Sequence, residues 1–503
     1  MYVYYNPVRW DAWFYNFRAL LLIFKPYTWY GHLAEIFFAA WLVYCGHAIG
    51  RMLLYGFSIS SREYPCSVPL ALGWGFLSLM IFVLACIQLL ISETILGLLI
   101  LVSVIHLIRL CISWVRGSAS VPQPAHLFQP GWRTNFRVGR WVLWAFIAWA
   151  VMIAFCSSIM PPTQSDGLRY HLTVPKLYLL HGGLYPIPNL SFSNFPFLIE
   201  FLYVIPLAFN LLSGPKLIHF VYFLITLNLV YALTEKGIGR GGGIWGTALV
   251  ATITFVPIFA SWSFIEFGLT AYTVLAFWFS LQVLEECRMQ RVSHALKLAA
   301  LTGISSGLMV SCKYTALATL AFLGLMVSDP VRLMRTREWK QVGVRILVLM
   351  GAAGMLASPW FVRNWLWFGN PMYPFAGNLF PTPGWSEFNQ LFFTYHAGMK
   401  GSLTAVLQAP IHMKILDLIS LPFRLTFFPG DRAHGHPEDF GAWPIGAIWL
   451  VGLLFLVFYR NWDWRGRWHL IFGGFLYLVW AYTYRDTRFL LPALVVSPRC
   501  WRE

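Results

Sequence analysis

Long apolar stretches dominate the pattern of hydrophobic and polar positions along this chain. Many approach the roughly 20 residues that a helix needs to cross a bilayer. Each should be helical, because lipid offers backbone groups no other partner. These runs lie at 34–55, 68–91, 93–114, 141–160, 216–234, 244–264, 267–285, 342–361, 442–459 and 469–484. The stretch 296–328, interrupted by Lys313, predicts a tight helical hairpin. The pattern therefore predicts an all-α, polytopic transmembrane protein with about 11–13 spans.

The composition excludes other classes of protein. Of the 503 residues, 58% are hydrophobic and only 11% are charged, whereas a soluble domain carries about 25% charged residues. Disorder is also excluded, because it needs low hydrophobicity. The net charge of +16 is, in such a chain, first a signal of topology. No nucleic acid partner is expected, and the scattered cysteines predict neither a disulfide framework nor a zinc site.

Basic residues gather in a few connectors, which the positive-inside rule assigns to the cytoplasm. The chain then divides into an N-terminal transmembrane segment (1–115), whose orientation is left open, a basic cytoplasmic loop (116–140) and a transmembrane core (141–497). The core has outer loops at 161–215 and 362–440. The basic connectors contain Arg116, Arg133, Arg137 and Arg140; Arg288, Arg291 and Lys297; Arg332, Arg335, Arg337 and Lys340; and Arg460, Arg465 and Arg467.

One apolar segment of the core should not cross the membrane. The short link 235–243 (EKGIGRGGG) should join the basic connectors in the cytoplasm, yet between Arg140 and this link the sequence offers three apolar helices. The segment 195–213 carries Glu200 and Pro206 and is the best candidate to lie along the outer interface. With this assignment the rest of 161–215 forms helices next to the membrane on its outer face.

The outer loop 161–215 opens with candidate chemistry. Asp166 follows the end of a span, where a carboxylate could act as general base toward a hydroxyl group. The alternative is that Ser165 or Asp166 only caps the helix that follows. His171 could assist the base or bind a phosphate, or it could be an ordinary polar residue of that helix. Arg169 lies between them in the sequence.

Further ionisable residues are predicted on the same outer face. Ionisable groups close to hydrocarbon are costly and tend to face a polar cavity, although a lone Lys or Arg more commonly snorkels to the interface. As a set, cations and carboxylates beside a bilayer suit a phosphorylated lipid with a transferable group, because the cations stabilise the leaving phosphate. This chemistry is glycosyl transfer from a polyprenyl-phosphate sugar. The residues are Glu266, Lys313, Arg363, Arg485 and Arg488.

An ordered series of motifs gives the chain a family resemblance. The strings SDGLRYHLTVPKLYLLHGG, SNFPFLIEFLY, IEFGLTAY, GISSGLMVSCKYTAL and SPWFVRNWLWFGNPMYPF make residues 140–495 resemble the polytopic GT-C glycosyltransferases. The chain is most similar to the bacterial relatives of protein mannosyltransferases and aminoarabinose transferases of glycosyltransferase family 39. The resemblance implies a conserved core of spans and inversion by direct displacement at the anomeric carbon.

The resemblance also implies roles for individual residues. The family's first-loop acid falls on Asp166, its second-loop acid on Glu266, its hairpin-apex Lys on Lys313, and its late Arg before a Leu-Pro pair on Arg488. Glu266 stands where such relatives more often carry Asp. The last apolar stretch, from Phe489, also ends about halfway through a span, where relatives continue.

These inferences give a set of expectations. Asp166 and Glu266 should be catalytic, in an integral protein of a bacterial inner membrane with its site on the periplasmic side. The partners should be a polyprenyl-phosphate-linked sugar donor, membrane lipid, and an acceptor glycan, lipid or protein. No cofactor should be required; a divalent metal is an open alternative, with Glu266, His434 and His436 as weak candidate ligands. The residues expected to bind substrate are Arg169, His171, Lys313, Arg363, Arg485 and Arg488.

Two other functions fit the same residues. One is a transporter or flippase of a lipid-linked or anionic solute, whose charges would line a translocation path. The other is a glycan polymerase or ligase that uses a pyrophosphate carrier.

Overall fold

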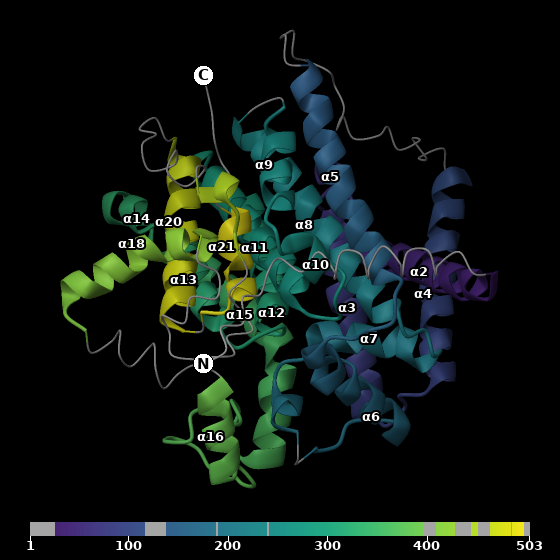
Figure 1. Cartoon of the computed structure of the whole chain (residues 1–503). Helices are drawn as coiled ribbons and strands as arrows, with labels where there is room; N and C mark the ends of the chain where they lie inside the picture. Colours follow the sequence, from purple (N-terminus) through teal and green to yellow (C-terminus); the bar gives the residue numbers. More distant parts are fainter. Residues whose placement is uncertain are drawn as a thin grey trace.

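The structure is a computed structural model that describes residues 26–115, 137–187, 190–238, 241–396, 409–427, 444–450, 463–483 and 485–496. Within these ranges the chain forms helices and no strands. Eight of the helices are long and apolar enough to cross a membrane, by length and composition (Figure 1). The predicted all-α, polytopic class is therefore confirmed. Most of the basic loop 116–140 and of the predicted span 442–459 lies outside the described residues.

The N-terminal segment contains three long helices. The first two approach each other closely, because a Cβ atom added to Gly73 would lie 1.7 Å from the carbonyl oxygen of Gly46. Small residues at such a crossing let two backbones meet within a membrane. The helices are α2 (Pro26–Gly56), α3 (Ser67–Cys86) and α4 (Ser92–Val115), with the short turn η1 (Ser61–Glu63) between α2 and α3.

The segment 161–215, which the sequence predicts as an outer loop with helices, is helical. It follows α5 (Arg137–Ser158) and contains η2 (Gly167–His171), α6 (Thr173–His181), η3 (Ser191–Asn194) and α7 (Leu198–Ala208). With 11 residues, α7 is too short to cross a bilayer, as expected for this segment. Every residue from Leu198 to Pro206 is buried, so protein and not lipid covers this helix; its position along the outer interface stays a prediction. Apart from Glu200 the side chains of α7 are hydrophobic, and a helix with apolar side chains on every face is stable inside the protein.

The next part of the core departs from the predicted spans at one point. The expected single helix 244–264 is wrong, because it breaks at Thr252–Phe255. Pro257 is the second residue of the second piece; its ring cannot continue a helix from the preceding turn, and it is tolerated in the first turn of a new one. The helices here are α8 (Gly214–Ile238), α9 (Gly242–Ala251), α10 (Val256–Ala260) and α11 (Glu266–Arg288).

The predicted helical hairpin is confirmed, with Lys313 in the turn between α12 (Val292–Val310) and α13 (Ala316–Ser328). Beyond it, α15 runs past the predicted end at residue 361, so that Arg363 lies on a helix and not in a loop. The remaining elements are α14 (Pro330–Thr336), α15 (Trp339–Phe368), α16 (Glu387–His396), α18 (Ile411–Phe427), α20 (Trp464–Tyr482), η5 (Thr487–Leu490) and α21 (Leu491–Val496).

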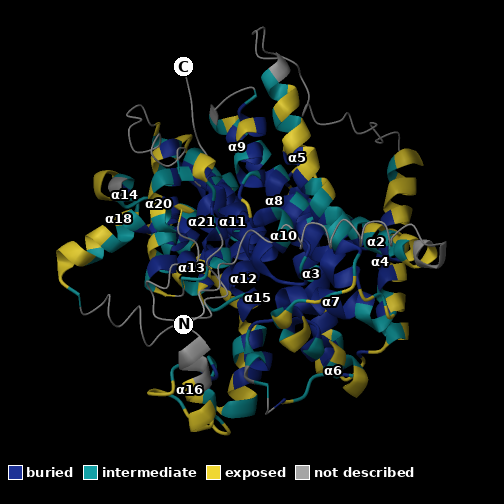
Figure 2. Cartoon of the chain, viewed as in Figure 1, coloured by how far each residue is buried: buried dark blue, intermediate teal, exposed yellow. Residues whose placement is uncertain are grey.

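The centre of the molecule is formed by α11. Its most apolar window is 94% buried inside the protein, whereas those of α4 and α5 are 22% buried. Figure 2 shows this contrast between the buried centre and the exposed flanking helices. Apolar side chains that point outward from a helix of this length are expected to face lipid. The helices around α11 therefore form the protein core, and α4 and α5 present apolar surface at its edge.

The long helices join two ends of the molecule. At one end, Arg332 donates a hydrogen bond to the carbonyl of Cys287, near the last residue of α11, and Arg465 of α20 pairs with Glu285. We call this the Arg332 end; it holds the basic connectors of the core. The other end holds the first residue of α11 and the turn between α12 and α13, and we call it the Asp166 end. In Figure 1, α9 lies toward the Arg332 end and α6 toward the Asp166 end.

Candidate functional site

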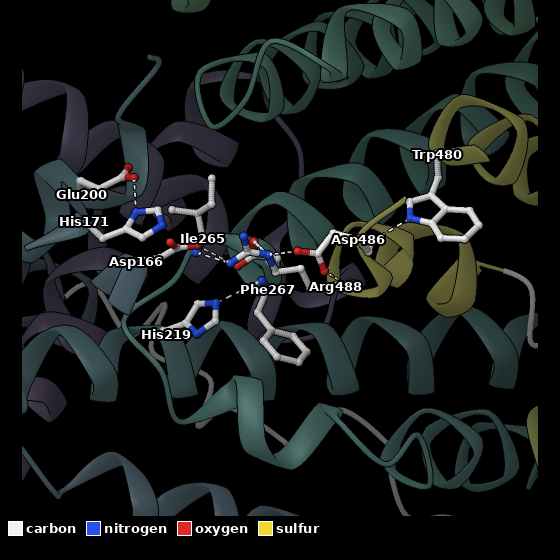
Figure 3. Close-up of polar contacts among 10 residues, drawn as sticks. Asp166, His171, Glu200, His219, Ile265, Phe267, Trp480, Asp486 and Arg488 are labelled. Atoms are coloured by element: carbon white, nitrogen blue, oxygen red, sulfur yellow. Dashed lines mark hydrogen bonds and ion pairs between the residues drawn. The ribbon is translucent and has the colours of Figure 1, made fainter. Parts of the chain in front are cut away.

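A single arginine at the Asp166 end joins three carboxylates from separate segments. Arg488 Nη1 lies 2.8 Å from Asp166 Oδ2, and its Nε lies 2.9 Å from Asp486 Oδ2. The same Nε lies 3.8 Å from Glu266 Oε1. Figure 3 shows the Arg488 side chain between Asp166 and Asp486. The structure thus brings together Asp166, Glu266 and Arg488, three of the predicted site residues, and adds Asp486.

Local hydrogen bonds hold Asp486 and Arg488 in place. Asp486 caps the short helix η5, since its Oδ1 accepts a hydrogen bond from Arg488 N at 3.1 Å. Its carbonyl oxygen accepts a hydrogen bond from Trp480 Nε1 at 2.7 Å. A capping aspartate fixes the direction of the first turn of a helix. The guanidinium of Arg488 is therefore aimed by the same residue that it pairs with.

The carboxylate of Asp166 is not used as a helix cap. Asp166 precedes η2, but its side chain makes no capping hydrogen bond to that helix. It turns instead to Arg488. The alternative that Asp166 only starts the following helix is therefore wrong, and its carboxylate belongs to the cluster.

Glu266 is the first residue of α11 and is buried. Its Oε2 accepts a hydrogen bond from Ile265 N at 3.2 Å, and a negative charge at a helix N-terminus is favourable. The next backbone amide, Phe267 N, donates to His219 Nε2 at 3.2 Å (Figure 3). This acceptance requires that His219 Nε2 carry no proton. A neutral histidine from α8 thus supports the turn that presents Glu266.

Lys313 points to the cluster and does not snorkel away from it. Its Nζ lies 2.8 Å from the centre of the Phe489 ring, and Phe489 is the neighbour of Arg488. A cation over an aromatic face is stabilised by the ring quadrupole. The hairpin apex therefore places a second cation beside the three carboxylates, as predicted.

The pKa shifts indicate which groups of the cluster hold a proton most readily. Burial would raise the pKa of Asp166, but the Arg488 charge beside it, with help from His171, holds that pKa below its usual value. For Asp486 burial prevails and its pKa is raised. Burial lowers the pKa of Lys313 to about 7, against the attraction of Glu266. Of the two aspartates, Asp486 is thus the readier to hold a proton, and Lys313 is poised to gain or lose one near neutral pH.

A buried histidine–glutamate pair lies beside Asp166. His171 Nδ1 and Glu200 Oε1 are 2.7 Å apart, and the two side chains are 2% and 1% exposed. Burial raises the pKa of Glu200, while the hydrogen bond from His171 opposes that rise. Figure 3 shows the pair next to the Asp166 side chain. His171 Nδ1 is therefore engaged by Glu200, and any contact with substrate would use its other ring nitrogen.

Sequence reasoning missed Glu200 and Asp486 as site residues. In the sequence, Glu200 indicates only that its segment does not cross the membrane. An ionisable residue within an otherwise apolar helix is itself a signal of a polar site. Asp486 lies two residues before Arg488, where a short acidic side chain commonly caps a turn, but nothing in the sequence shows which residue it pairs with.

Two of the predicted substrate-binding arginines have other partners. Arg363 Nη2 donates to the carbonyl of Phe195 at 3.1 Å and to Asn364 Oδ1 at 3.0 Å. Arg485 Nη2 pairs with Asp417 Oδ2 at 2.6 Å, which ties α18 to the segment before η5. No contact that joins either arginine to Arg488 or Asp166 is found among the described residues. Arg169 is exposed at the rim of the cluster, and its charge contributes to the lowered pKa of Asp166.

No metal-binding group is found in the described ranges, where no three His, Cys, Asp or Glu side chains gather in a way that could hold an ion. At the Asp166 end Arg488 contacts the carboxylates directly, and Lys313 is a second cation beside them. Glu266, a weak candidate ligand, faces the Arg488 guanidinium. His434 and His436, the other two candidates, lie outside the described residues.

Comparisons with known proteins give one structural similarity. No family model matches the sequence, and no curated protein matches it. Among solved structures, the chain is similar to a crystal structure of ArnT from Cupriavidus metallidurans bound to undecaprenyl phosphate, with 13% sequence identity and a TM-score of 0.43. The similarity covers 71% of this chain and 59% of that one, so the chain spans less than two thirds of the ArnT length.

Proposed function

We propose that this chain is an integral membrane glycosyltransferase that moves a sugar from a polyprenyl-phosphate donor to an acceptor on the outer, periplasmic face. The observation that carries the proposal is the contact of Arg488 with Asp166, Glu266 and Asp486, with Lys313 beside it. These residues come from four separate segments and meet at one end of the helices. A group of buried charges at the end of membrane helices is costly unless it serves a site.

The reaction would be a direct displacement at the anomeric carbon. The oxygen of the acceptor hydroxyl forms the new glycosidic bond as the bond from the anomeric carbon to the phosphate oxygen breaks. The proton of the hydroxyl passes to the Asp166 carboxylate, and the electron pair of the broken bond leaves with the polyprenyl phosphate. The configuration of the sugar is inverted, because attack comes from the face opposite the leaving group.

Arg488 and Lys313 would bind the phosphate. A phosphodiester donor carries one negative charge, and the charge grows as the phosphate leaves, so cations fixed beside it stabilise the transition state more than the ground state. Contact of Arg488 with the phosphate would weaken its pairing with Asp166. The pKa of Asp166 would then rise from the value that Arg488 now holds down, and the carboxylate would become a better base.

Glu266 and the His171–Glu200 pair would act around this step. Glu266 is held at the start of α11 and would orient the acceptor hydroxyl. His171 is fixed by Glu200 and would present its free ring nitrogen toward the side on which Asp166 lies. In this arrangement His171 is a positioning residue, which acts on the base Asp166 by helping to hold its pKa down. A divalent metal is not needed for any of these roles.

The position of the charges favours an enzyme over a transporter. A translocation path needs polar groups near the middle of the membrane, whereas Asp166, Lys313 and Asp486 lie outside the long helices and Glu266 is the first residue of one. The alternative of a pyrophosphate-carrier polymerase or ligase uses similar chemistry and differs in its product. Analysis of the product, one added sugar or a transferred chain, distinguishes these two enzymes.

The decisive experiment measures release of free undecaprenyl phosphate by the purified protein in detergent. The donors are undecaprenyl-phosphate hexoses and pentoses, tested with membrane extract as the source of acceptor. We expect release by the wild type and a loss of at least about a hundredfold with Asp166→Asn, since removal of a general base costs about 10²–10⁴-fold. Release in detergent separates the enzyme from a flippase, which would need two compartments.

The matched control is Glu387→Gln, which neutralises an exposed carboxylate at the first residue of α16 and should retain wild-type activity. Equal thermal melting of the Asp166→Asn and wild-type proteins shows that the variant is folded. Wild-type turnover by a folded Asp166→Asn would remove Asp166 from the mechanism. Absence of release by the wild type with every donor would overturn the proposed reaction.

A further inference from the structure

The Arg332 end contains a cavity that the proposed reaction does not use. Its volume is about 280 Å³, which is far more than one water molecule occupies. It lies at the junction of α11, α12, α14 and α15, at the opposite end of the long helices from Arg488. Its polar lining comes from Cys287, Gln290, Arg332, Glu338, Gln341 and Arg345.

Arg345 is the unusual member of this lining. Its side chain is only 6% exposed, and its Nε is buried without a hydrogen-bond partner. The guanidinium contacts the sulfur of Cys287, and no carboxylate in the described part of the chain lies within 4 Å of it. A buried charge without a counter-charge is costly. It persists most readily where an anion from outside the chain completes the site.

A second arginine faces the same cavity but is already partly neutralised. Arg332 Nη2 lies 3.7 Å from Glu338 Oε2, and its Nη1 donates to the carbonyl of Cys287. The lining therefore holds two guanidinium groups and one carboxylate. The excess positive charge belongs to Arg345, and the amides of Gln290 and Gln341 add neutral hydrogen-bond donors.

We propose that this cavity binds a phosphate monoester group. A planar guanidinium binds two phosphate oxygens at once, and Arg345, whose Nε has no hydrogen-bond partner, lines the cavity. Arg345 is the seventh residue of α15, about 9 Å along the helix from its first residue. A site this close to the helix end is within reach of a lipid headgroup at the membrane surface and of a phosphate compound from the adjoining aqueous phase.

The two sources are distinguished with two probes. The purified protein in detergent is titrated with glycerol 3-phosphate, read out by thermal melting, and with dioleoyl phosphatidic acid, read out by native mass spectrometry. Dioleoyl phosphatidylcholine is the lipid control, because its headgroup is not a monoester. Each probe is applied to the wild type, to Arg345→Gln and to Arg335→Gln. Arg335 lies on α14 at the same end but is exposed, so its variant carries the same loss of charge outside the cavity.

We expect one of the two phosphate probes to bind the wild type and Arg335→Gln equally, and to bind Arg345→Gln about tenfold or more weakly, as for the loss of one charge-assisted hydrogen bond. Binding of glycerol 3-phosphate identifies a soluble ligand. Binding of phosphatidic acid alone identifies a lipid headgroup. The Arg345→Gln protein should melt no lower than the wild type without ligand, because a buried unpaired charge is removed.

Failure of both probes to bind the wild type overturns the proposal, as does equal binding by Arg345→Gln. A lower melting temperature of unliganded Arg345→Gln overturns the premise that Arg345 is unpaired. None of these outcomes depends on sugar transfer at the Asp166 end. The proposal therefore fails or stands separately from the proposed function.

Discussion

Arg488 balances more charge than any other side chain described at the Asp166 end. It is paired with Asp166 and Asp486 and approaches Glu266, so its single positive charge faces three carboxylates. The guanidinium and the carboxylates tolerate burial only while they are paired with one another. Removal of one partner leaves the others buried and unpaired, which is destabilising. Substitution of Arg488 should therefore disturb both folding and activity, in proportions that depend on the replacement.

Arg488→Lys and Arg488→Met separate these two effects. An ammonium is a single point charge and cannot reproduce the two-sided contact of a guanidinium with Asp166 and Asp486. We expect Arg488→Lys to fold and to lose donor-dependent release by at least about a hundredfold, of the order found when a fixed charge-stabilising donor is removed. Arg488→Met should also melt at a lower temperature, by an amount equivalent to about 3–5 kcal/mol. Wild-type activity in Arg488→Lys would show that the guanidinium geometry has no part in the reaction.

Lys313 should give donor binding a dependence on pH. Its pKa is lowered to about 7 by burial, so the protonated fraction falls as the pH rises through that value. Lys313 attracts the donor phosphate only in its protonated, ammonium form. The KM for donor should therefore increase several-fold as the pH rises from about 7 to about 8.5. Lys313→Arg should remove this increase, because an arginine stays charged throughout. The same increase in KM in Lys313→Arg and wild type would assign the titration to another group.

At the scale of helices, close packing decides how the N-terminal segment is held. The crossing of α2 and α3 is made by glycines: a Cβ atom on Gly50 would lie 1.7 Å from the carbonyl oxygen of Pro69, and one on Gly73 equally close to that of Gly46. These atoms belong to the backbone and cannot turn aside as a flexible side chain can. The two helices must therefore separate to admit even one methyl group.

Gly73→Ala should lower stability for this reason. Overpacking of a close crossing costs about 1–3 kcal/mol, which thermal melting in detergent detects. The control is Gly97→Ala on α4, where no atom lies within 4 Å of the added Cβ; there the higher helix propensity of alanine should leave stability unchanged or slightly raised. An unchanged melting temperature in Gly73→Ala would contradict the observed packing of α2 on α3.

The elements also show what a single sequence reveals and what it does not. Hydrophobic length predicted the hairpin around Lys313 and the helical content of 161–215, because those properties follow from runs of apolar residues. It did not predict the break at Thr252–Phe255, since one proline in an apolar run can either kink a helix or end it. The full burial of α7 was missed for a similar reason: apolar composition does not tell whether lipid or protein covers a short helix.

For the molecule as a whole, the alternation of helix direction determines which chain segments lie at the same end. The basic connectors fixed which chain segments share an end, and this placed Asp166, Glu266, Lys313 and Arg488 together before any contact was known. It did not separate Arg485 from Arg488, because which of two neighbouring arginines meets Asp166 depends on the turn that Asp486 caps. The alternation of helix direction determines the end of the molecule at which a residue lies. Side-chain packing determines which residue it contacts there.

The outer location of the proposed site is testable on the whole protein with single cysteines in a background that lacks the native ones. Leu180 on α6 and Leu379 after α15 are 76% and 81% exposed toward the Asp166 end, and Met334 on α14 is 70% exposed at the Arg332 end. We expect a membrane-impermeant maleimide to label Leu180→Cys and Leu379→Cys in intact cells, and Met334→Cys only after permeabilisation, because basic connectors are retained in the cytoplasm. The reverse pattern would keep the cluster intact but place its chemistry on the inner face. Labelling of both Leu180→Cys and Met334→Cys from the same side of the membrane would contradict the arrangement of the long helices between two ends.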